Sequence, residues 1–215
     1  MERYKYPRTY HFSFSEGATS DDKIIENDNM LEGRVVVVTT KMDGENTTIY
    51  PDGTFHARSL DSKHREYHSW LLSKIPCFCY NIPSGCRVCG EYLYARHSIA
   101  YIDLEDYFLA FSIWNANNDC LSWADTKDLC KEIGLSIVPE LYIGPFDLDL
   151  IKQIAKDTVK HGQEGIVVRN ADSFNIADFS SNIAKYVRAN HVQTDIHWTQ
   201  QRIVANELRR VYETN

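Results

Sequence analysis

The stretch "TTKMDGENTTIYPDG", residues 39–53, sets the local fold of this chain and raises a chemical question. The apolar run 35–38 leads into it, Asp43 and Gly44 are residue types that tight turns prefer, and "TTIY" then resumes an extended pattern. These features predict a strand, a turn and a second strand. Such a unit has no need of an amine, yet Lys41 lies where the buried strand ends.

Periodicity and turn signals extend this pattern along the chain. The helix predicted at 122–133 has Ser122 and Asp125 in capping-box-like spacing and stops at Gly134. The predicted strands lie within 34–58, 86–95, 107–114, 164–170 and 182–189, and the predicted helices at 62–74, ended by Pro76, at 122–133, at 147–161, ended by Gly162, and at 195–213. The sum is a mixed α+β domain with antiparallel sheets.

Length and composition indicate a single domain over residues 1–215, with 43% hydrophobic and 25% charged residues. No stretch approaches the roughly 18 apolar residues that a membrane span needs, and the N-terminus lacks the apolar segment of a signal peptide. We therefore expect a cytoplasmic protein without membrane contact. Residues 1–30 suggest only a strand followed by a loop.

The formal net charge of -7 argues against a protein that coats nucleic acid through bulk electrostatics. Any nucleic-acid contact must then be local. Basic residues gather in three places, which could equally be solvated surface: Arg58 with Lys63, His64, Arg65 and His68; Arg96 with His97; and Lys185 with Arg188 and His191.

Four of the six cysteines, Cys77, Cys79, Cys86 and Cys89, fall close together. Four thiolates could bind zinc, but C-x-C followed by six residues and C-x2-C does not match the longer separation of zinc ribbons. Buried reduced cysteines are the better interpretation, because the sequence "CRVCGEYLYA" around Cys89 is apolar. Without a secretory signal we expect no structural disulfide.

A lysine becomes a nucleophile only when enough of its amine is unprotonated. Lys41 enters from a Val-rich strand, so partial desolvation would lower its pKa, whereas the carboxylate of Asp43 would oppose deprotonation. Cationic groups or a metal would then have to come close when substrate binds. By itself K-x-D-G occurs by chance, and an exposed turn lysine is the commoner explanation.

Further motifs follow Lys41 along the chain: "ARSLD" (57–61), "GEYLYA" (90–95), "AFSIW" (110–114), "EGIVVR" (164–169) and "AKYVR" (184–188). Together they resemble the lysine-dependent nucleotidyltransferases, the superfamily of polynucleotide ligases and capping enzymes. "KMDGENTT", "HARSLDS", "GEYLYARHSIAY" and "EGIVVRN", with "RANHVQTD" after the last motif, look most like the RNA ligase family. The resemblance runs from about 39 to 198, most of the chain.

The resemblance implies the nucleotidyltransferase fold of a ligase catalytic core, with antiparallel sheets flanked by helices in an ATP-grasp-like arrangement. It also implies a reaction in three steps. Lys41 attacks the α-phosphate of ATP, the lysine-bound AMP passes to an RNA 5′-phosphate, and a 3′-hydroxyl displaces AMP and seals the strand. The implied metal is Mg²⁺ or Mn²⁺. Only about 25 residues follow "AKYVR", so we expect no appended oligonucleotide-binding barrel (OB-fold) within 1–215.

The resemblance also implies roles for single residues. Arg58 would contact the acceptor or AMP phosphate, and Lys185 would neutralise the α-phosphate. Glu91 would accept a hydrogen bond from the ribose, Phe111 would stack on the purine, and Glu164 would help to bind the metal. The implied nucleotide-binding set is Thr40, Lys41, Asp43, Gly44, Arg58, Glu91, Phe111, Glu164, Val167 and Lys185, of which Lys41, Arg58 and Lys185 are the catalytic candidates.

Local pattern alone leaves other interpretations of these residues open. Arg58 could be a surface arginine, Phe111 a plain core residue and Glu164 an exposed strand end. Arg169 and Arg188 could assist at the phosphates or could equally lie on the outer surface.

Three positions depart from the family pattern. Relatives often place a glutamate directly before the nucleophile, where it helps to recognise the base, whereas this chain has Thr40. The preference for ATP over GTP is therefore an inference. Relatives commonly carry two lysines two residues apart in the last motif, but here the second position is Val187 and the next cation is Arg188. Ser112 stands where an aspartate often follows the stacking aromatic residue.

The leading hypothesis is an ATP-dependent RNA ligase that joins 5′-phosphate and 3′-hydroxyl RNA ends in RNA repair. A DNA ligase or a guanylyltransferase of the same superfamily is the nearest alternative. A non-catalytic nucleic-acid-binding module is a second class, although a pure binder needs no reactive lysine. RNA would be held through the basic groups around Arg58 and Arg96, or through a partner protein.

Overall fold

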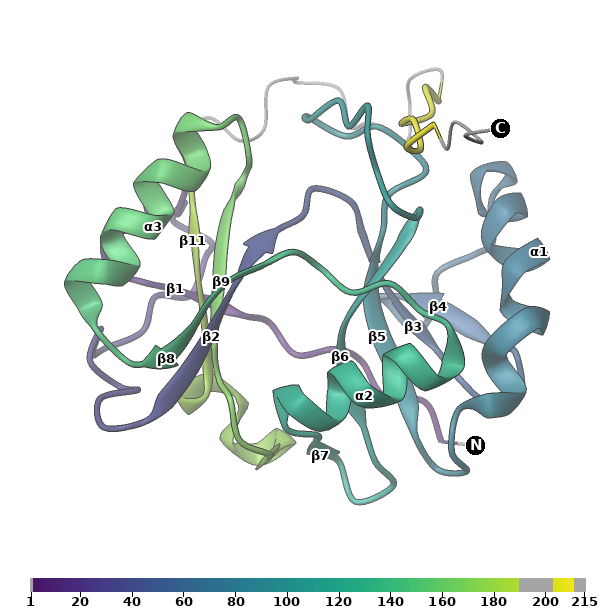
Figure 1. Ribbon diagram of the computed structural model, residues 1–215, viewed down its shortest axis with the longest axis horizontal. Coiled ribbons are helices and arrows are strands. Elements are labelled where there is room, and N and C mark those ends of the chain that lie inside the picture. Colours follow the sequence, from purple (N-terminus) through teal and green to yellow (C-terminus); the bar gives the residue numbers. More distant parts are fainter. Residues whose placement is uncertain (1, 190–202, 211–215) are drawn as a thin grey trace, which may run out of the picture.

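Two β-sheets lie side by side in the computed structural model, which describes residues 2–189 and 203–210 (Figure 1). The five-stranded sheet, in the order β1-β11-β9-β2-β8, consists of β1 (Tyr10–His11), β2 (Val35–Lys41), β8 (Glu140–Pro145), β9 (Gly165–Asn170) and β11 (Ile183–Val187). The six-stranded sheet, in the order β10-β7-β6-β5-β3-β4, consists of β3 (Glu45–Ile49), β4 (Phe55–Ala57), β5 (Arg87–Tyr92), β6 (Phe108–Trp114), β7 (Asp119–Cys120) and β10 (Phe174–Asn175). Within these sheets every pairing is antiparallel, as predicted, except that of β1 with β11.

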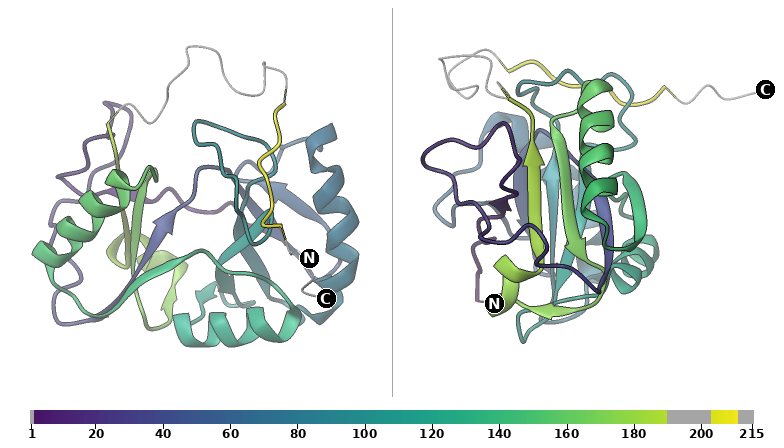
Figure 2. Two further views of the ribbon diagram at one scale, coloured as in Figure 1. Left: turned by 45° about the horizontal axis from the view of Figure 1, so that its top comes forward. Right: turned by 90° about the vertical axis from the view of Figure 1, so that its left-hand side faces the viewer.

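Helices cover the outer sides of the two sheets. The α-helices of the described residues are α1 (Ser69–Phe78), α2 (Trp123–Ile133) and α3 (Leu148–Lys160), and 3-10 turns occur at Glu66–His68, Cys79–Asn81 and Ile176–Ser181. Figure 1 shows α3 beside the five-stranded sheet and α1 beside the six-stranded sheet, and Figure 2 shows α3 running along β9. None of the described helices combines the length and the apolar character that crossing a membrane requires.

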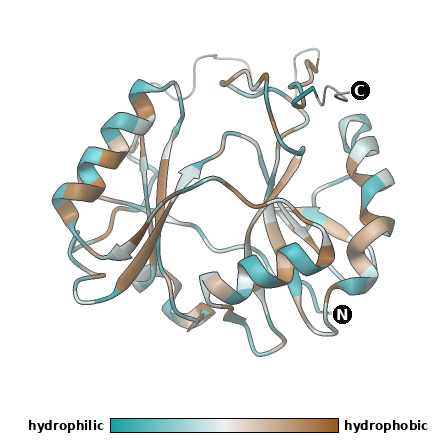
Figure 3. Ribbon diagram, in the orientation of Figure 1, coloured by the Kyte–Doolittle hydropathy of each residue, from teal (hydrophilic) through white to brown (hydrophobic). Residues whose placement is uncertain are grey.

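Each helix buries its apolar side against the neighbouring sheet. Ile151 and Ala155 of α3 pack in one core with Val36 and Val168, and all four side chains are fully buried. Figure 3 shows this arrangement as hydrophobic colour along β2 and β9, with hydrophilic residues recurring along α2 and α3. Because burying one such aliphatic side chain contributes roughly 1.5–3 kcal/mol, these faces hold the helices in place.

The stretch around Lys41 passes the chain from one sheet to the other. β2 ends at Lys41 in the five-stranded sheet and β3 begins at Glu45 in the six-stranded sheet, so the two predicted strands exist but do not pair. The Asp43 carboxylate fixes this crossing, because its Oδ2 atom accepts hydrogen bonds from the backbone N–H (2.8 Å) and the hydroxyl (2.6 Å) of Ser98. The turn therefore joins two sheets and places the end of β2 between them.

The helix predicted at 62–74 begins and ends later than expected. A 3-10 turn at Glu66–His68 runs into α1, and α1 contains Pro76, so the prediction that this proline ends the helix was wrong. Pro76 cannot donate a hydrogen bond to the carbonyl of Leu72, four residues earlier. Leu72 is 45% exposed, so water can satisfy that carbonyl and the helix can continue.

The helix predicted at 195–213 is wrong over residues 203–210. Ala205 and Leu208 form isolated β-bridges to the loop that follows β5, and the Asn206 side chain donates a 2.7 Å hydrogen bond to a backbone carbonyl of the same loop. The apolar spacing fits a helix, but these partners lie about a hundred residues away and favour an extended chain. The rest of that prediction lies outside the described residues.

Gly165, the first residue of β9, allows β11 to approach closely. A Cβ built there would lie 1.9 Å from the backbone carbonyl oxygen of Tyr186, which cannot move without disturbing the sheet. We expect Gly165→Ala to lower the free energy of unfolding by about 3 kcal/mol, the upper end of overpacking effects. Urea denaturation would measure this, with Lys160→Ala on the exposed end of α3 as the control. Equal stabilities of the two variants would contradict the prediction.

Candidate active site

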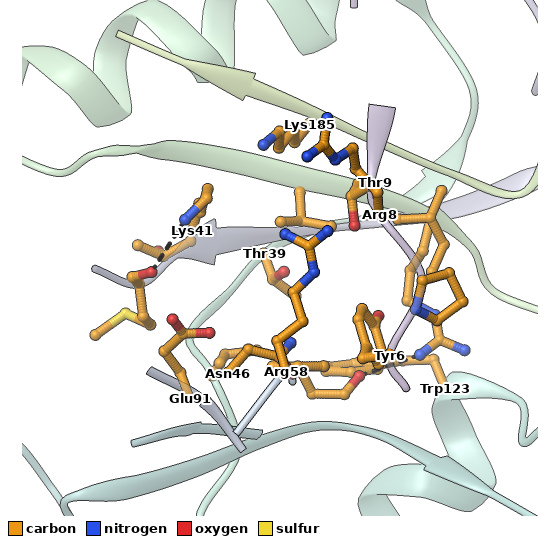
Figure 4. A pocket seen from close by; sticks show the side chains of 18 of the residues that line it. Tyr6, Arg8, Thr9, Thr39, Lys41, Asn46, Arg58, Glu91, Trp123 and Lys185 are labelled. Atoms are coloured by element: carbon orange, nitrogen blue, oxygen red, sulfur yellow. Dashed lines mark hydrogen bonds between the residues drawn. The ribbon is translucent and has the colours of Figure 1, made fainter. Parts of the chain in front are cut away.

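A pocket lies between the two sheets, and residues from both sheets line it (Figure 4). Seven residues of the predicted nucleotide-binding set are among its lining residues: Thr40, Lys41, Arg58, Glu91, Phe111, Val167 and Lys185. Of the remaining three, Glu164 joins the site through its contact with Lys41, whereas Asp43 and Gly44 do not line the pocket. Residues that are far apart in sequence therefore meet at one place.

Lys41 ends β2 and is opposite Gly165, the first residue of β9. Its Nζ atom lies 2.7 Å from Oε2 of Glu164 and 3.4 Å from the carbonyl oxygen of Met42. The Lys41 side chain is 24% exposed and the Glu164 side chain 7% exposed. The amine is thus held at the pocket wall with part of its surface open to a ligand.

Charge around Lys41 favours the ammonium form. Burial alone would lower the pKa of its amine, but the carboxylates of Glu164, Glu91 and Asp43 outweigh burial and raise that pKa above its ordinary value. The predicted opposition from Asp43 is therefore present, but Glu164 contributes more. A reaction at this amine would require that these negative charges be neutralised.

Glu91 lies on β5 and faces the same pocket. Its Oε1 atom accepts a 3.2 Å hydrogen bond from the backbone N–H of Gly44. Gly44 can approach because it has no Cβ, which would lie 2.6 Å from a backbone oxygen of β5. Burial, with added repulsion from Glu164 and Asp43, raises the pKa of Glu91 to about 7. Glu91 can therefore accept or donate a hydrogen bond near neutral pH.

Two cations, Arg58 and Lys185, also line the pocket. Burial lowers the pKa of Lys185 to about 8, and the charges of Lys41 and Arg58 add to this effect. Neither side chain forms a hydrogen bond or an ion pair with a protein group in the described part of the chain. Cations with free donors suit phosphate oxygens, which accept charge-assisted hydrogen bonds.

The floor of the pocket is aromatic and apolar. Phe111, Val167 and Trp123 contribute to it, together with Arg169. Arg169 is 3% exposed and donates to the carbonyl oxygens of Phe111 (3.2 Å) and Leu121 (2.9 Å), so it lies beneath the pocket and not on the outer surface. Such a floor suits the flat face of a nucleobase.

At each of the three positions that depart from the family pattern, the residue forms a hydrogen bond within the protein. Thr40 is buried and its N–H donates to the carbonyl of Pro139 at 2.9 Å. The Val187 N–H donates to Oγ of Ser15 at 2.9 Å, and the Val187 side chain is buried. The hydroxyl of Ser112 accepts a 3.0 Å hydrogen bond from the indole N–H of the neighbouring Trp114. Val187 and Ser112 do not line the pocket.

Several lining residues were not identified from the sequence. Asn46 on β3 is one, and its Oδ1 atom is buried without a hydrogen-bond partner among the described residues. Asn46 lies five residues after Lys41, at the start of the strand that follows the turn. This closeness to Lys41 in the sequence could have identified it. The N-terminal segment contributes Tyr6, Pro7, Arg8 and Thr9, for which the sequence offered no signal.

The carboxylates fit a metal that is shared with a phosphate ligand. Among the described residues, no group of three or more His, Cys, Asp or Glu side chains is arranged to hold a metal ion. The four clustered cysteines therefore do not form such a group either. Mg²⁺ usually takes one or two carboxylates and completes its coordination with water and phosphate oxygens. Glu164 offers one such carboxylate beside Lys41, so it is compatible with the predicted metal role.

Comparison with solved structures shows the same fold. An archaeal ATP-dependent RNA ligase matches with a TM-score of 0.59 and 17% identity over 85% of this chain and 48% of that chain. A putative ATP-dependent DNA ligase from Aquifex aeolicus matches with a TM-score of 0.59 and 20% identity over 86% and 50% of the two chains. A variant of a Naegleria gruberi RNA ligase with ATP and Mn matches with a TM-score of 0.53 and 17% identity over 85% and 57%.

These likenesses confirm the predicted α+β fold of a ligase catalytic core. The chain spans about half the length of the solved structures that it matches. No curated protein sequence gives a significant match. The family model described as RNA ligase matches residues 34–187, which is well over half of the chain and includes every predicted site residue. The protein therefore belongs to the RNA ligase family.

Proposed function

We propose that this protein is an ATP-dependent RNA ligase, which joins 5′-phosphate and 3′-hydroxyl RNA ends through a covalent lysine–AMP intermediate in RNA repair. One observation carries the proposal. The Lys41 amine lies in the same pocket as two cations, Arg58 and Lys185, that have no protein partner among the described residues. Family membership supports a nucleotidyltransferase that acts on RNA.

In the first step, Nζ of Lys41 attacks the α-phosphorus of ATP. A phosphorus–nitrogen bond forms, the bond to the bridging oxygen breaks, and pyrophosphate leaves. The ammonium group must lose a proton to solvent before it attacks, and Glu164, whose Oε2 atom lies 2.7 Å away, orients it. A divalent cation bound at Glu164 would neutralise this carboxylate and part of the phosphate charge. Lys185 and Arg58 would stabilise the charge that develops on the phosphate oxygens.

In the second step, an oxygen of the RNA 5′-phosphate attacks the lysine-bound phosphorus, and Lys41 leaves as an amine. In the third step, the 3′-hydroxyl attacks the RNA 5′-phosphorus and AMP leaves. All three steps need little more than positioning and charge neutralisation, which are what a pocket lined by cations provides. Phe111 and Val167 would hold the base on the pocket floor, and Glu91 would accept a hydrogen bond from the ribose.

Intact mass spectrometry tests the proposal. The purified protein is first treated with pyrophosphate to remove any nucleotide already attached, and is then incubated with Mg²⁺ and either ATP or GTP. We expect a mass gain that matches AMP. A gain that matches GMP would indicate a guanylyltransferase, and no gain with either nucleotide would favour a non-catalytic module. Sealing of nicked RNA and nicked DNA by the adenylylated protein would then separate an RNA ligase from a DNA ligase.

The proposed binding of RNA by Arg58 and Arg96 leads to a separate prediction. Arg58 lines the pocket, and Arg96 is half-buried in the loop that follows β5. If each contacts an RNA phosphate, replacing both by alanine should weaken RNA binding and reduce the slope of log affinity against log salt by about one for each contact. Binding to nicked RNA without nucleotide would measure this, with Lys131→Ala on α2 as the control. Unchanged binding would indicate that a partner protein, and not these two arginines, holds the RNA.

A further inference from the structure

The N-terminal segment crosses from one sheet to the other along one face of the molecule (Figure 2). Near its start, the backbone N–H of Tyr4 donates a 3.0 Å hydrogen bond to the hydroxyl of Tyr50, next to the six-stranded sheet. The segment ends in β1, the edge strand of the five-stranded sheet. Figure 1 shows this part of the chain passing between the two sheets. It therefore closes a side of the pocket that neither sheet covers.

Tyr6 is the residue of this segment that reaches the aromatic floor. Its ring meets Phe111 edge-on, with centroids 5.3 Å apart and an angle of 71° between the rings. It also meets Phe179 at 5.4 Å and Trp114 at 6.4 Å, again edge-on. These three contacts place the Tyr6 ring among aromatic side chains of the core. Tyr6 is thus held through its ring.

The partners of Tyr6 differ in how firmly they are held. Trp114 is fully buried and Phe179 is 4% exposed, so their rings are fixed by the surrounding core. Phe111 is only half-buried, because one side of it faces the pocket. An edge-on contact restrains the orientation of a ring and occupies no more than one of its two faces. Tyr6 is therefore placed to hold the Phe111 ring while leaving a face open to a ligand.

We propose that Tyr6 is a positioning residue for nucleotide binding, which sets the Phe111 ring so that a purine can stack on it. This inference rests on the proposed function, because Phe111 is taken as the stacking residue. The N-terminal segment would then contribute to nucleotide binding as well as lining the pocket. Tyr6 itself need not touch the nucleotide, since it acts through its edge-on contact with Phe111 on β6.

The test compares variants at Tyr6 with a matched variant at Tyr4. Tyr4 belongs to the same segment, but its ring lies over the guanidinium of Arg87 and does not line the pocket. We expect Tyr6→Ala to raise the Kd for AMP, measured by calorimetry, and the KM for ATP in adduct formation by roughly threefold to tenfold. The rate at saturating ATP should be unchanged, and Tyr6→Phe, which keeps the ring, should remain within about twofold of the parent for both constants.

Thermal unfolding of each variant separates positioning from stability. If Tyr6→Ala is unfolded at the assay temperature, Tyr6→Leu, which fills the space without an aromatic edge, replaces it in the comparison. A lowered melting temperature with unchanged Kd for AMP would overturn the inference and leave Tyr6 a core residue. The same loss of affinity in Tyr4→Ala would also overturn it, because the effect would then come from the segment as a whole.

AMP binds without forming a covalent bond, whereas the proposed function is tested by a covalent adduct. The inference about Tyr6 and the proposed function can therefore fail independently of each other. If the parent protein binds AMP but forms no adduct with ATP, the proposed function fails, and weaker AMP binding by Tyr6→Ala still supports the inference. If the parent forms the adduct and Tyr6→Ala matches it in both constants, only the inference fails. If the parent binds neither AMP nor ATP, both are rejected.

Discussion

Replacing Lys41 by alanine is expected to abolish the covalent nucleotide adduct, a loss on the order of 10³-fold or more, because no bond to phosphorus can form without the amine. The fold should persist. The Lys41 side chain is 24% exposed and, among the described residues, its one side-chain partner is Glu164, so its removal leaves no large cavity. Intact mass after incubation with ATP and Mg²⁺ measures the adduct, and thermal unfolding checks the fold.

Lys185 provides the matched control, because it is a second amine in the same pocket. In the free protein its pKa is lowered to about 8 by burial and by Lys41 and Arg58, whereas the pKa of Lys41 is raised. On charge alone, Lys185 would be the better nucleophile. We expect Lys185→Ala to form the AMP adduct slowly and peptide mapping to locate that adduct on Lys41. An adduct that survives in Lys41→Ala and disappears in Lys185→Ala would reverse the assignment.

The secondary structure followed from sequence where the signals are local. Helix α2 begins after Ser122, whose side chain accepts a hydrogen bond from the N–H of Asp125, and it ends at Gly134 with a left-handed backbone, φ 76°. Both signals are readable in the sequence. The prediction at Pro76 failed because Leu72, whose carbonyl loses its helical partner, is an exposed residue, and the exposure of a helix face depends on the tertiary fold. The same limit explains the extended residues 203–210.

The candidate site was only partly predictable for a similar reason. Lys41 and Arg58 belong to motifs whose residue types carry chemical meaning, and the structure places both at one pocket. Tyr6 belongs to no such motif, because an aromatic residue near an N-terminus has no preferred partner in sequence terms. Its contact with Phe111 exists because the segment crosses between the sheets, and that path depends on the pairing of β1 with β11.

Replacing Glu164 by glutamine is expected to change two measurable reactivities of Lys41 in opposite directions. The carboxylate of Glu164 is the strongest of the charges that raise the pKa of Lys41, and glutamine keeps the shape and an acceptor oxygen without the charge. The pKa of the amine should therefore fall. Its rate of reaction with a neutral amine-directed reagent near neutral pH should rise about tenfold for each unit by which the pKa falls.

Formation of the AMP adduct by Glu164→Gln should instead fall by roughly 10²-fold, because the carboxylate that accepts a hydrogen bond from Lys41 and could hold a metal beside the phosphates is lost. Peptide-resolved labelling of Lys41 over a pH series and the rate of adduct formation measure the two effects, with Asp103→Asn as an exposed acidic control. In the parent protein adduct formation should rise as pH rises, since only the neutral amine attacks and its pKa is raised. If both reactivities of Glu164→Gln rise together, Glu164 serves only to hold the amine protonated, and its metal role is wrong. If both fall together, Glu164 acts mainly by orienting the amine.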